Sequence, residues 1–110
     1  VIVSNHGGRQ VDVGQATIDA LKTIAPLYKG KLTIMMDSGI RGGADVARVM
    51  ASGADFSFMG RTFMYGVSAL GKKGGNHTIS MLKQQLTQVM EQMSCAEISN
   101  LQSKLIQENN

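Results

Sequence analysis

The sequence of 110 residues contains one cysteine, one proline and no tryptophan, and it has no long run of apolar residues. Because Cys95 is the only cysteine, an intrachain disulfide is excluded, which fits a reducing compartment. Cys95 stands among helix-forming residues without a nearby histidine or basic cluster, so we expect a buried, unreactive thiol. The absence of a long apolar span and of a cleavage site excludes a visible membrane helix or signal peptide.

The charge of the chain is small and dispersed. The formal net charge is +3 at pH 7, and the only adjacent basic residues are Lys72 and Lys73. Binding of nucleic acid or of a membrane surface therefore has little support, because both need concentrated basic residues. One phosphate-bearing ligand would be a sufficient partner for so small an excess of charge. The hydrophobic fraction of 43% is typical of a soluble globular protein.

Three strand-then-helix units follow one another along the chain. Apolar runs at 1–3, 32–36 and 56–59 predict strands, and the segments 18–28, 44–52 and 62–70 predict helices. Pro26 is expected to end or kink the first helix near Ala25, and Gly53 to end the second. After a loop over 71–76, the pattern predicts an amphipathic helix over 79–93, a last helix over 96–107 and frayed residues at 108–110.

Largely apolar strands that alternate with helices indicate a parallel sheet covered on at least one side. Active sites of such folds, above all of (β/α)8 barrels, lie in the loops that follow the strands. Three units are too few to close a barrel of eight. The sequence therefore predicts an α/β fold that comprises the C-terminal three βα units of a (β/α)8 TIM barrel, as one partial domain over 1–110. The loops that follow the strands carry polar residues: His6 and Arg9, then Asp37 and Arg41, then Arg61.

The start of the sequence also fits a partial domain. The chain starts at Val1 rather than at an initiator methionine, and the first polar loop is already under way at Ser4. We therefore expect the sequence to be a segment of a longer chain, with the first five barrel units upstream.

The first loop, Ser4-Asn5-His6-Gly7-Gly8-Arg9, is the most informative motif. An imidazole is the side chain best suited to move protons near neutral pH, which points to His6. The guanidinium of Arg9 has the shape to hold a planar carboxylate with two parallel hydrogen bonds. The pair suggests a site that binds a small acid and removes a proton close to its carboxylate. Asp12 is a candidate to orient His6, although predicted loop separates the two.

The second and third loops indicate a phosphate site. The glycines of the segment 37–43 allow a ligand to approach the backbone, and amides at a helix start attract anions. Arg41 and Arg61 add positive charge, and the two loops are expected to be neighbours because they follow adjacent strands. Alternatively, the glycines only form tight turns. Asp37 is suited to bind ribose or ribityl hydroxyls, or instead to cap a helix or brace its loop. No metal site is expected, because no cluster of ligands has suitable spacing.

These motifs together resemble a known family. Ser-Asn-His-Gly-Gly-Arg-Gln at 4–10, Asp-Ser-Gly-Ile-Arg at 37–41 and Met-Gly-Arg at 59–61 occur in the order and spacing of the FMN-dependent α-hydroxy acid dehydrogenases and oxidases. The resemblance covers nearly the whole chain. It implies an FMN-dependent oxidation of an L-2-hydroxy acid, with L-lactate as the expected substrate, to the 2-oxo acid.

The resemblance also implies a role for each matching residue. His6 would be the active-site base, Arg9 would bind the substrate carboxylate, and Ser4 would contact the flavin. The family's lysine near the flavin, its aspartate partner of the histidine and its substrate-facing tyrosines all belong to the upstream units. The ribityl chain and phosphate of FMN would be held by Asp37, Ser38, Gly39, Ile40, Arg41, Gly60 and Arg61.

The implied partners are a small 2-hydroxy acid and an electron acceptor of unknown identity, with no nucleic acid. The complete enzyme would be a homo-oligomer in the cytoplasm, with peripheral association at the inner membrane as the alternative. Other interpretations stay open: a catalytically inactive barrel fragment or FMN/phosphate-binding module, and a fragment whose open sheet edge needs another chain. A phosphate-binding barrel without flavin is opposed by the His-Gly-Gly-Arg motif.

Overall fold

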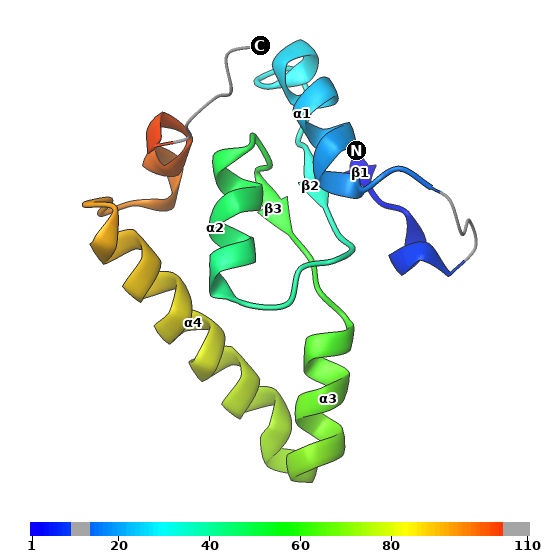
Figure 1. The fold of residues 1–110 in the computed structure, drawn as a ribbon, viewed down its shortest axis with the longest axis vertical. Coiled ribbons are helices and arrows are strands. Elements are labelled where there is room, and N and C mark those ends of the chain that lie inside the picture. The colour runs from blue at the N-terminus through cyan, green and yellow to red at the C-terminus, as the bar shows by residue number, and fades with distance from the viewer. Residues whose placement is uncertain (10–13, 105–110) are drawn as a thin grey trace.

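The structure, a computed structural model, describes residues 1–9 and 14–104. Three short strands alternate with helices, and a long helix follows the last unit (Figure 1). Within this part of the chain, no helix combines the length and the apolar character needed to cross a bilayer. The elements are β1 (Ile2–Val3), α1 (Thr17–Tyr28), β2 (Met35–Met36), α2 (Gly43–Ala51), β3 (Phe56–Ser57), α3 (Arg61–Leu70) and α4 (Gly74–Gln92), with 3₁₀ segments at His6–Gly8, Gly71–Lys73 and Ile98–Lys104.

The strands form one parallel sheet in the order β1-β2-β3. They are shorter than the predicted apolar runs. Directly before β2, the Asp55 carboxylate accepts a hydrogen bond from the Ile34 amide at 2.9 Å. This amide is therefore not available for a backbone hydrogen bond that would extend the strand. Leu32, predicted to lie inside this strand, is 50% exposed. The alternation of parallel strands with helices nevertheless confirms the predicted α/β fold.

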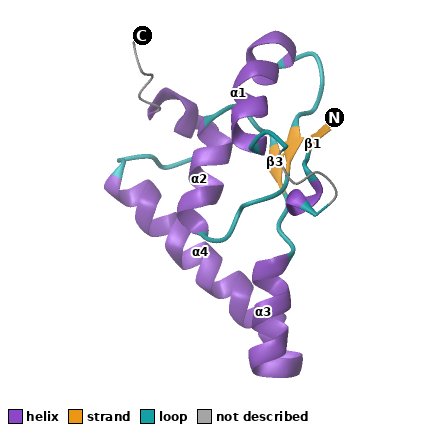
Figure 2. Ribbon diagram, turned by 45° about the vertical axis from the view of Figure 1, so that its right-hand side comes forward, coloured by secondary structure: helices purple, strands orange, loops and turns teal. Residues whose placement is uncertain are grey.

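Helices α1 and α2 cover one face of the sheet (Figure 2). Strand residues alternate between the two faces, so Val3 and Met36 are buried beneath these helices. Each fully buried apolar side chain of this kind contributes about 1.5–3 kcal/mol to folding. On the other face, Ile2 and Phe56 stand at one register level and are more than half exposed. The main core consists of Val3, Leu21, Ala25, Ile34, Met36, Ile40, Val49 and Ala54.

Helix α4 packs along α2 and ends beside the 3₁₀ segment Ile98–Lys104 (Figure 1). A second core lies among these three elements and contains Ala47, Ala51, Cys95 and Leu101. Cys95 is buried, as predicted.

Several predicted boundaries were wrong. Pro26 lies inside α1, which continues to Tyr28. The carbonyl that loses its amide partner belongs to Lys22, and Lys22 is exposed, so water can satisfy that carbonyl. The predicted loop over 71–76 is instead a 3₁₀ turn followed by α4 from Gly74. The last predicted helix is a 3₁₀ segment over Ile98–Lys104, and residues 105–110 lie outside the described part. Gly53 ends α2 as predicted, with a φ of 115°.

Candidate functional site

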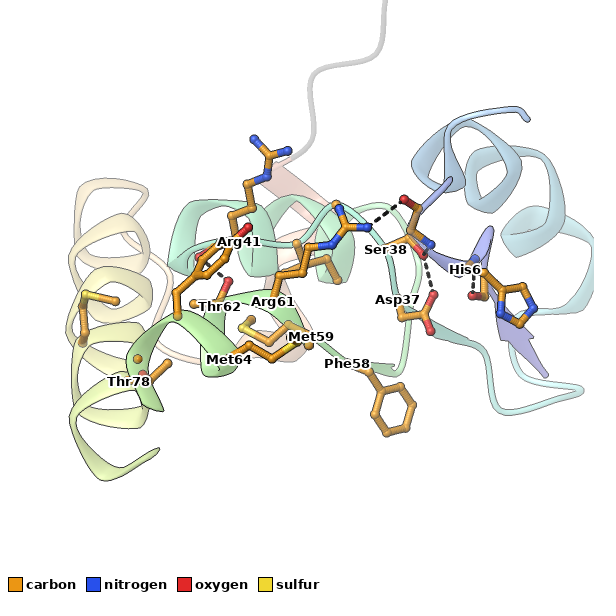
Figure 3. A pocket seen from close by; sticks show the side chains of 18 of the residues that line it. His6, Asp37, Ser38, Arg41, Phe58, Met59, Arg61, Thr62, Met64 and Thr78 are labelled. Carbon is orange, nitrogen blue, oxygen red and sulfur yellow. Dashed lines mark hydrogen bonds between the residues drawn. The ribbon is translucent and has the colours of Figure 1, made fainter. Parts of the chain in front are cut away.

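The polar loops after β1, β2 and β3 meet in one open pocket at the carboxyl edge of the sheet (Figure 3). Parallel strands place these loops at the same edge, as the sequence predicts. The pocket has a volume of about 1540 Å³ and continues between α3 and the start of α4. All of the predicted site residues line it: Ser4, His6, Arg9, Asp37, Ser38, Gly39, Ile40, Arg41, Gly60 and Arg61.

The loop after β1 turns sharply at His6. His6, Gly7 and Gly8 have φ values of 56°, 67° and 75°, so three successive residues adopt left-handed backbone. This conformation suits glycine and is uncommon for histidine. The turn is closed by the Gly8 amide, which donates to the Asn5 carbonyl at 3.0 Å. The side chains of His6 and Arg9 are exposed to solvent at the pocket, where they can meet a ligand.

The loop after β2 lies against this turn. Ser38 Oγ accepts a hydrogen bond from the Gly7 amide at 3.1 Å and donates one to Asp37 Oδ1 at 2.7 Å. The Asn5 amide also donates to Ser38 Oγ, at 3.5 Å. Figure 3 shows Asp37 and Ser38 between Arg61 and His6. The serine hydroxyl therefore joins the loop after β2 to the turn that carries His6.

The loop after β3 leads directly into α3 and brings a helix start and Arg61 to the pocket. Helix α3 begins at Arg61 without a side-chain cap, so its first amides have no side-chain acceptor. An added Cβ at Gly60 would meet nothing within 4 Å, which leaves open space beside these amides. Arg61 NH2 donates to the Gly7 carbonyl at 3.1 Å, and Thr62 Oγ1 donates to the Arg41 carbonyl at 3.1 Å. The two predicted phosphate loops are therefore neighbours.

The donors at this end fit the phosphate of FMN. Free amides at a helix start and guanidinium groups are the kinds of donor that bind phosphate dianions, and the start of α3, Arg41 and Arg61 provide both at this pocket. Asp37 lines the same pocket, and a carboxylate can accept hydrogen bonds from the hydroxyl groups of a ribityl chain. The start of α2 differs, because the Gly43 amide already donates to Gln85 Oε1 at 2.8 Å. The start of α3 therefore keeps more amides free of side-chain acceptors than the start of α2.

Sequence reasoning missed part of the pocket, and the structure shows which part of one predicted residue can reach it. Ile40 is 6% exposed and belongs to the core, so only its backbone can reach a ligand. The apolar wall formed by Phe58, Met64 and Tyr65 was not predicted. The only feature of the sequence that could have indicated them is the spacing of apolar residues along 56–65. This spacing fits packing in a core equally well. Asp12 lies outside the described residues, and the residues that are described contain no cluster able to hold a metal ion.

Comparisons with known proteins assign the chain to a family. The family described as FMN-dependent dehydrogenase matches residues 1–108. An L-lactate dehydrogenase of Alcaligenes faecalis is 41% identical over 106 residues, which are 96% of this chain and 28% of that protein. 2-Hydroxyacid oxidase 2 of Rattus norvegicus is 37% identical over 107 residues, which are 97% of this chain and 30% of that protein.

Solved structures agree with this assignment. A lactate oxidase structure from Pediococcus acidilactici superimposes with a TM-score of 0.87 and 38% identity, covering 93% of this chain and 28% of that one. The chain thus spans less than a third of the length of these relatives, and it matches the C-terminal part of their TIM barrels, as predicted. We conclude that the chain belongs to the FMN-dependent dehydrogenases and oxidases of 2-hydroxy acids.

Proposed function

We propose that this chain supplies the base, the carboxylate-binding residue and the FMN phosphate site of an enzyme that oxidises an L-2-hydroxy acid to the 2-oxo acid. The observation that carries the proposal is that one pocket gathers an exposed histidine, three arginines and an uncapped helix start. Since the chain spans 28% to 30% of its relatives, the activity belongs to a complete barrel.

In this proposal the cofactor is held at the carboxyl edge of the sheet. Gly60, Arg61 and Arg41 bind the phosphate, Asp37 binds the ribityl chain, and Ser4 contacts the flavin. The remaining backbone around 38–40 lets the ribityl chain lie close to the loop. FMN, when bound, would accept the two electrons and one of the two protons that the substrate loses, and the other proton would go to His6. The family's FMN dependence and the free donors at α3 support this placement.

The substrate lies between the cofactor and the loop after β1. Arg9 binds its carboxylate, because a guanidinium can donate two parallel hydrogen bonds to both carboxylate oxygens. A ring nitrogen of His6 accepts the proton that the 2-hydroxy acid releases as it is oxidised. Both side chains are exposed in this chain, so the walls that exclude water from the reaction belong to the upstream barrel units.

L-Lactate is the proposed substrate. Two of these relatives carry lactate in their names, at 41% and 38% identity. Mandelate oxidase, at 32% identity, is the competing example of a relative with a larger substrate. Phe58, Met64 and Tyr65 line the same pocket and offer apolar surface for the side chain of a larger 2-hydroxy acid.

A binding module without chemistry is the second candidate. It is favoured by one observation: the groups proposed to bind the phosphate all line one pocket, whereas the His6 ring has no hydrogen-bond partner among residues 1–9 and 14–104. A chain that held FMN but lacked an oriented base would bind the flavin and not oxidise the acid.

A chimera tests the two candidates. The segment of the Alcaligenes faecalis L-lactate dehydrogenase that aligns with this chain is replaced by this chain, which restores a complete barrel. We expect the purified chimera to contain FMN and to oxidise L-lactate, measured by reduction of an artificial electron acceptor. Bound FMN without oxidation of L-lactate, glycolate or L-mandelate would support the binding module instead.

Variants of the chimera test the residue roles. His6→Ala should retain FMN while kcat falls by about 10²–10⁴, the usual contribution of a general base. Arg9→Lys should chiefly raise KM for L-lactate, because the second parallel hydrogen bond is lost. Arg48→Lys, an exposed arginine on α2, is the matched control and should leave both constants unchanged. Normal turnover of His6→Ala would remove the assigned base.

A further inference from the structure

Two non-glycine residues with left-handed backbone face each other in the site. His6 has a φ of 56° and Ser38 a φ of 79°. Such conformations are unfavourable for residues with a Cβ, and they persist where surrounding contacts hold them. A glycine at position 38 would adopt this backbone without strain, as the neighbouring Gly39 does at 76°. The serine side chain must therefore provide something that a glycine lacks.

The Ser38 hydroxyl connects the two strained residues. It accepts hydrogen bonds from the Gly7 amide at 3.1 Å and from the Asn5 amide at 3.5 Å. These amides belong to the residues directly before and after His6, so the hydroxyl holds the backbone on both sides of the histidine. The shorter bond, to Gly7, is the stronger of the two.

The direction of the hydroxyl group is fixed by Asp37. A serine hydroxyl has one proton and two acceptor positions. Its proton is donated to Asp37 Oδ1 at 2.7 Å, which leaves both lone pairs for the two amides. The Ser38 side chain thus has no hydrogen-bonding capacity left for a ligand, although it lines the pocket.

Both backbone groups of Gly7, its amide and its carbonyl, are held by hydrogen bonds. Arg61 NH2 donates to the Gly7 carbonyl at 3.1 Å, while the Gly7 amide donates to Ser38. The turn is therefore fixed between the loop after β2 and the start of α3 (Figure 3). A turn that carries a base needs such support, since small displacements of a catalytic group are costly in rate.

We propose that Ser38 is a positioning residue that sets the backbone of His6, rather than a side-chain ligand of FMN. This inference rests on the proposed role of His6 as the base. In this proposal the hydrogen bonds of the Ser38 hydroxyl offset the strain of the left-handed backbone at position 38. They also hold the turn around His6 in place before the substrate binds. The backbone of the 37–41 loop stays available to the cofactor.

The first test uses Ser38→Gly in the chimera, because glycine tolerates the backbone and removes only the hydroxymethyl group. We expect FMN content and KM to be unchanged and kcat to fall about tenfold, the effect of losing one or two hydrogen bonds. Ser38→Ala should lower kcat similarly, which separates the hydroxyl from backbone strain. In the His6→Ala background, Ser38→Gly should not lower the residual rate further.

The second test measures the turn without catalysis. Amide hydrogen exchange of Gly7 is recorded by NMR in the 110-residue chain. Ser38→Gly should raise the exchange rate of the Gly7 amide about tenfold, because its acceptor is removed. The Met35 amide, which donates to the Val1 carbonyl in the sheet, is the internal control and should not change.

The outcomes separate the two proposals. If His6→Ala turns over normally, the proposed function fails, whatever Ser38 does. If His6→Ala is impaired but Ser38→Gly retains wild-type kcat and Gly7 exchange, the positioning role is overturned. Loss of FMN from Ser38→Gly would likewise overturn it, because the side chain would then be a cofactor ligand.

Discussion

The crossing of α3 and α4 gives the sharpest test of the packing. An added Cβ on Gly74, at the start of α4, would overlap the Gly66 carbonyl oxygen of α3. It would also lie 2.5 Å from the Gly66 carbonyl carbon and 2.6 Å from Val67 Cα. Favourable contacts between carbon atoms are about 3.5–4.0 Å, so Gly74→Ala must push the two helices apart. All three obstructing atoms belong to the backbone and cannot rotate away.

The expected magnitude follows from two opposing terms. Over-packing costs about 1–3 kcal/mol, and the upper part of that range, about 2–3 kcal/mol, applies here because the obstructing atoms are backbone atoms. Alanine recovers about 1 kcal/mol through its higher helix propensity. We therefore expect Gly74→Ala to lower the free energy of unfolding by about 1–2 kcal/mol. At about 4–8 °C for each kcal/mol in a small domain, Tm should fall by roughly 4–16 °C.

The next residue along the chain is the matched control. An added Cβ on Gly75 would meet nothing within 4 Å. Gly75→Ala should therefore raise stability by about 0.4–1 kcal/mol, because alanine restricts the unfolded chain. Both variants are compared with the unsubstituted chain by thermal unfolding, which is followed by far-UV circular dichroism. Equal or higher Tm for Gly74→Ala would refute the close crossing that positions α3, and with it Arg61.

Two further predictions concern the corner where α1 meets the start of β3. Hydrogen bonds from the Ile34 amide and from Lys29, at 2.9 and 2.6 Å, hold the pKa of Asp55 below its ordinary value. This contribution is complete above the ordinary aspartate pKa and is lost as pH falls through the lowered folded-state pKa. The stability of Asp55→Asn and of wild type is measured by urea unfolding at neutral and acid pH. Acidification should lower the stability of Asp55→Asn less than that of wild type. An equal loss would show that the hydrogen bonds to the Asp55 carboxylate do not stabilise the fold. Gly53→Ala should lower stability by about 1–3 kcal/mol in thermal unfolding, because φ is 115° and the new Cβ lies 2.6 Å from Ala25 Cβ; unchanged Tm would contradict this geometry.

The order of the motifs along the chain correctly predicts where the pocket lies. Polar residues that follow three successive apolar runs must meet at one edge if the strands are parallel neighbours. His6, Asp37 and Arg61 accordingly line one pocket. The same local pattern fails to predict the extent of the elements. The run 32–36 is predicted as a strand throughout, but a side chain from Asp55, about twenty residues away, takes the Ile34 amide.

The sequence by itself determined the family, the order of strands and loops, and which polar loops meet at the pocket. These follow from motifs and apolar periodicity, which are properties of neighbouring residues. Only the tertiary structure decided that the Ser38 hydroxyl points to Gly7 and that Gly74 lies against the backbone of α3. Such contacts depend on the register and crossing of separate elements. A hydroxyl group or a missing Cβ has no periodic signal, so its partner is defined only when the chain is folded.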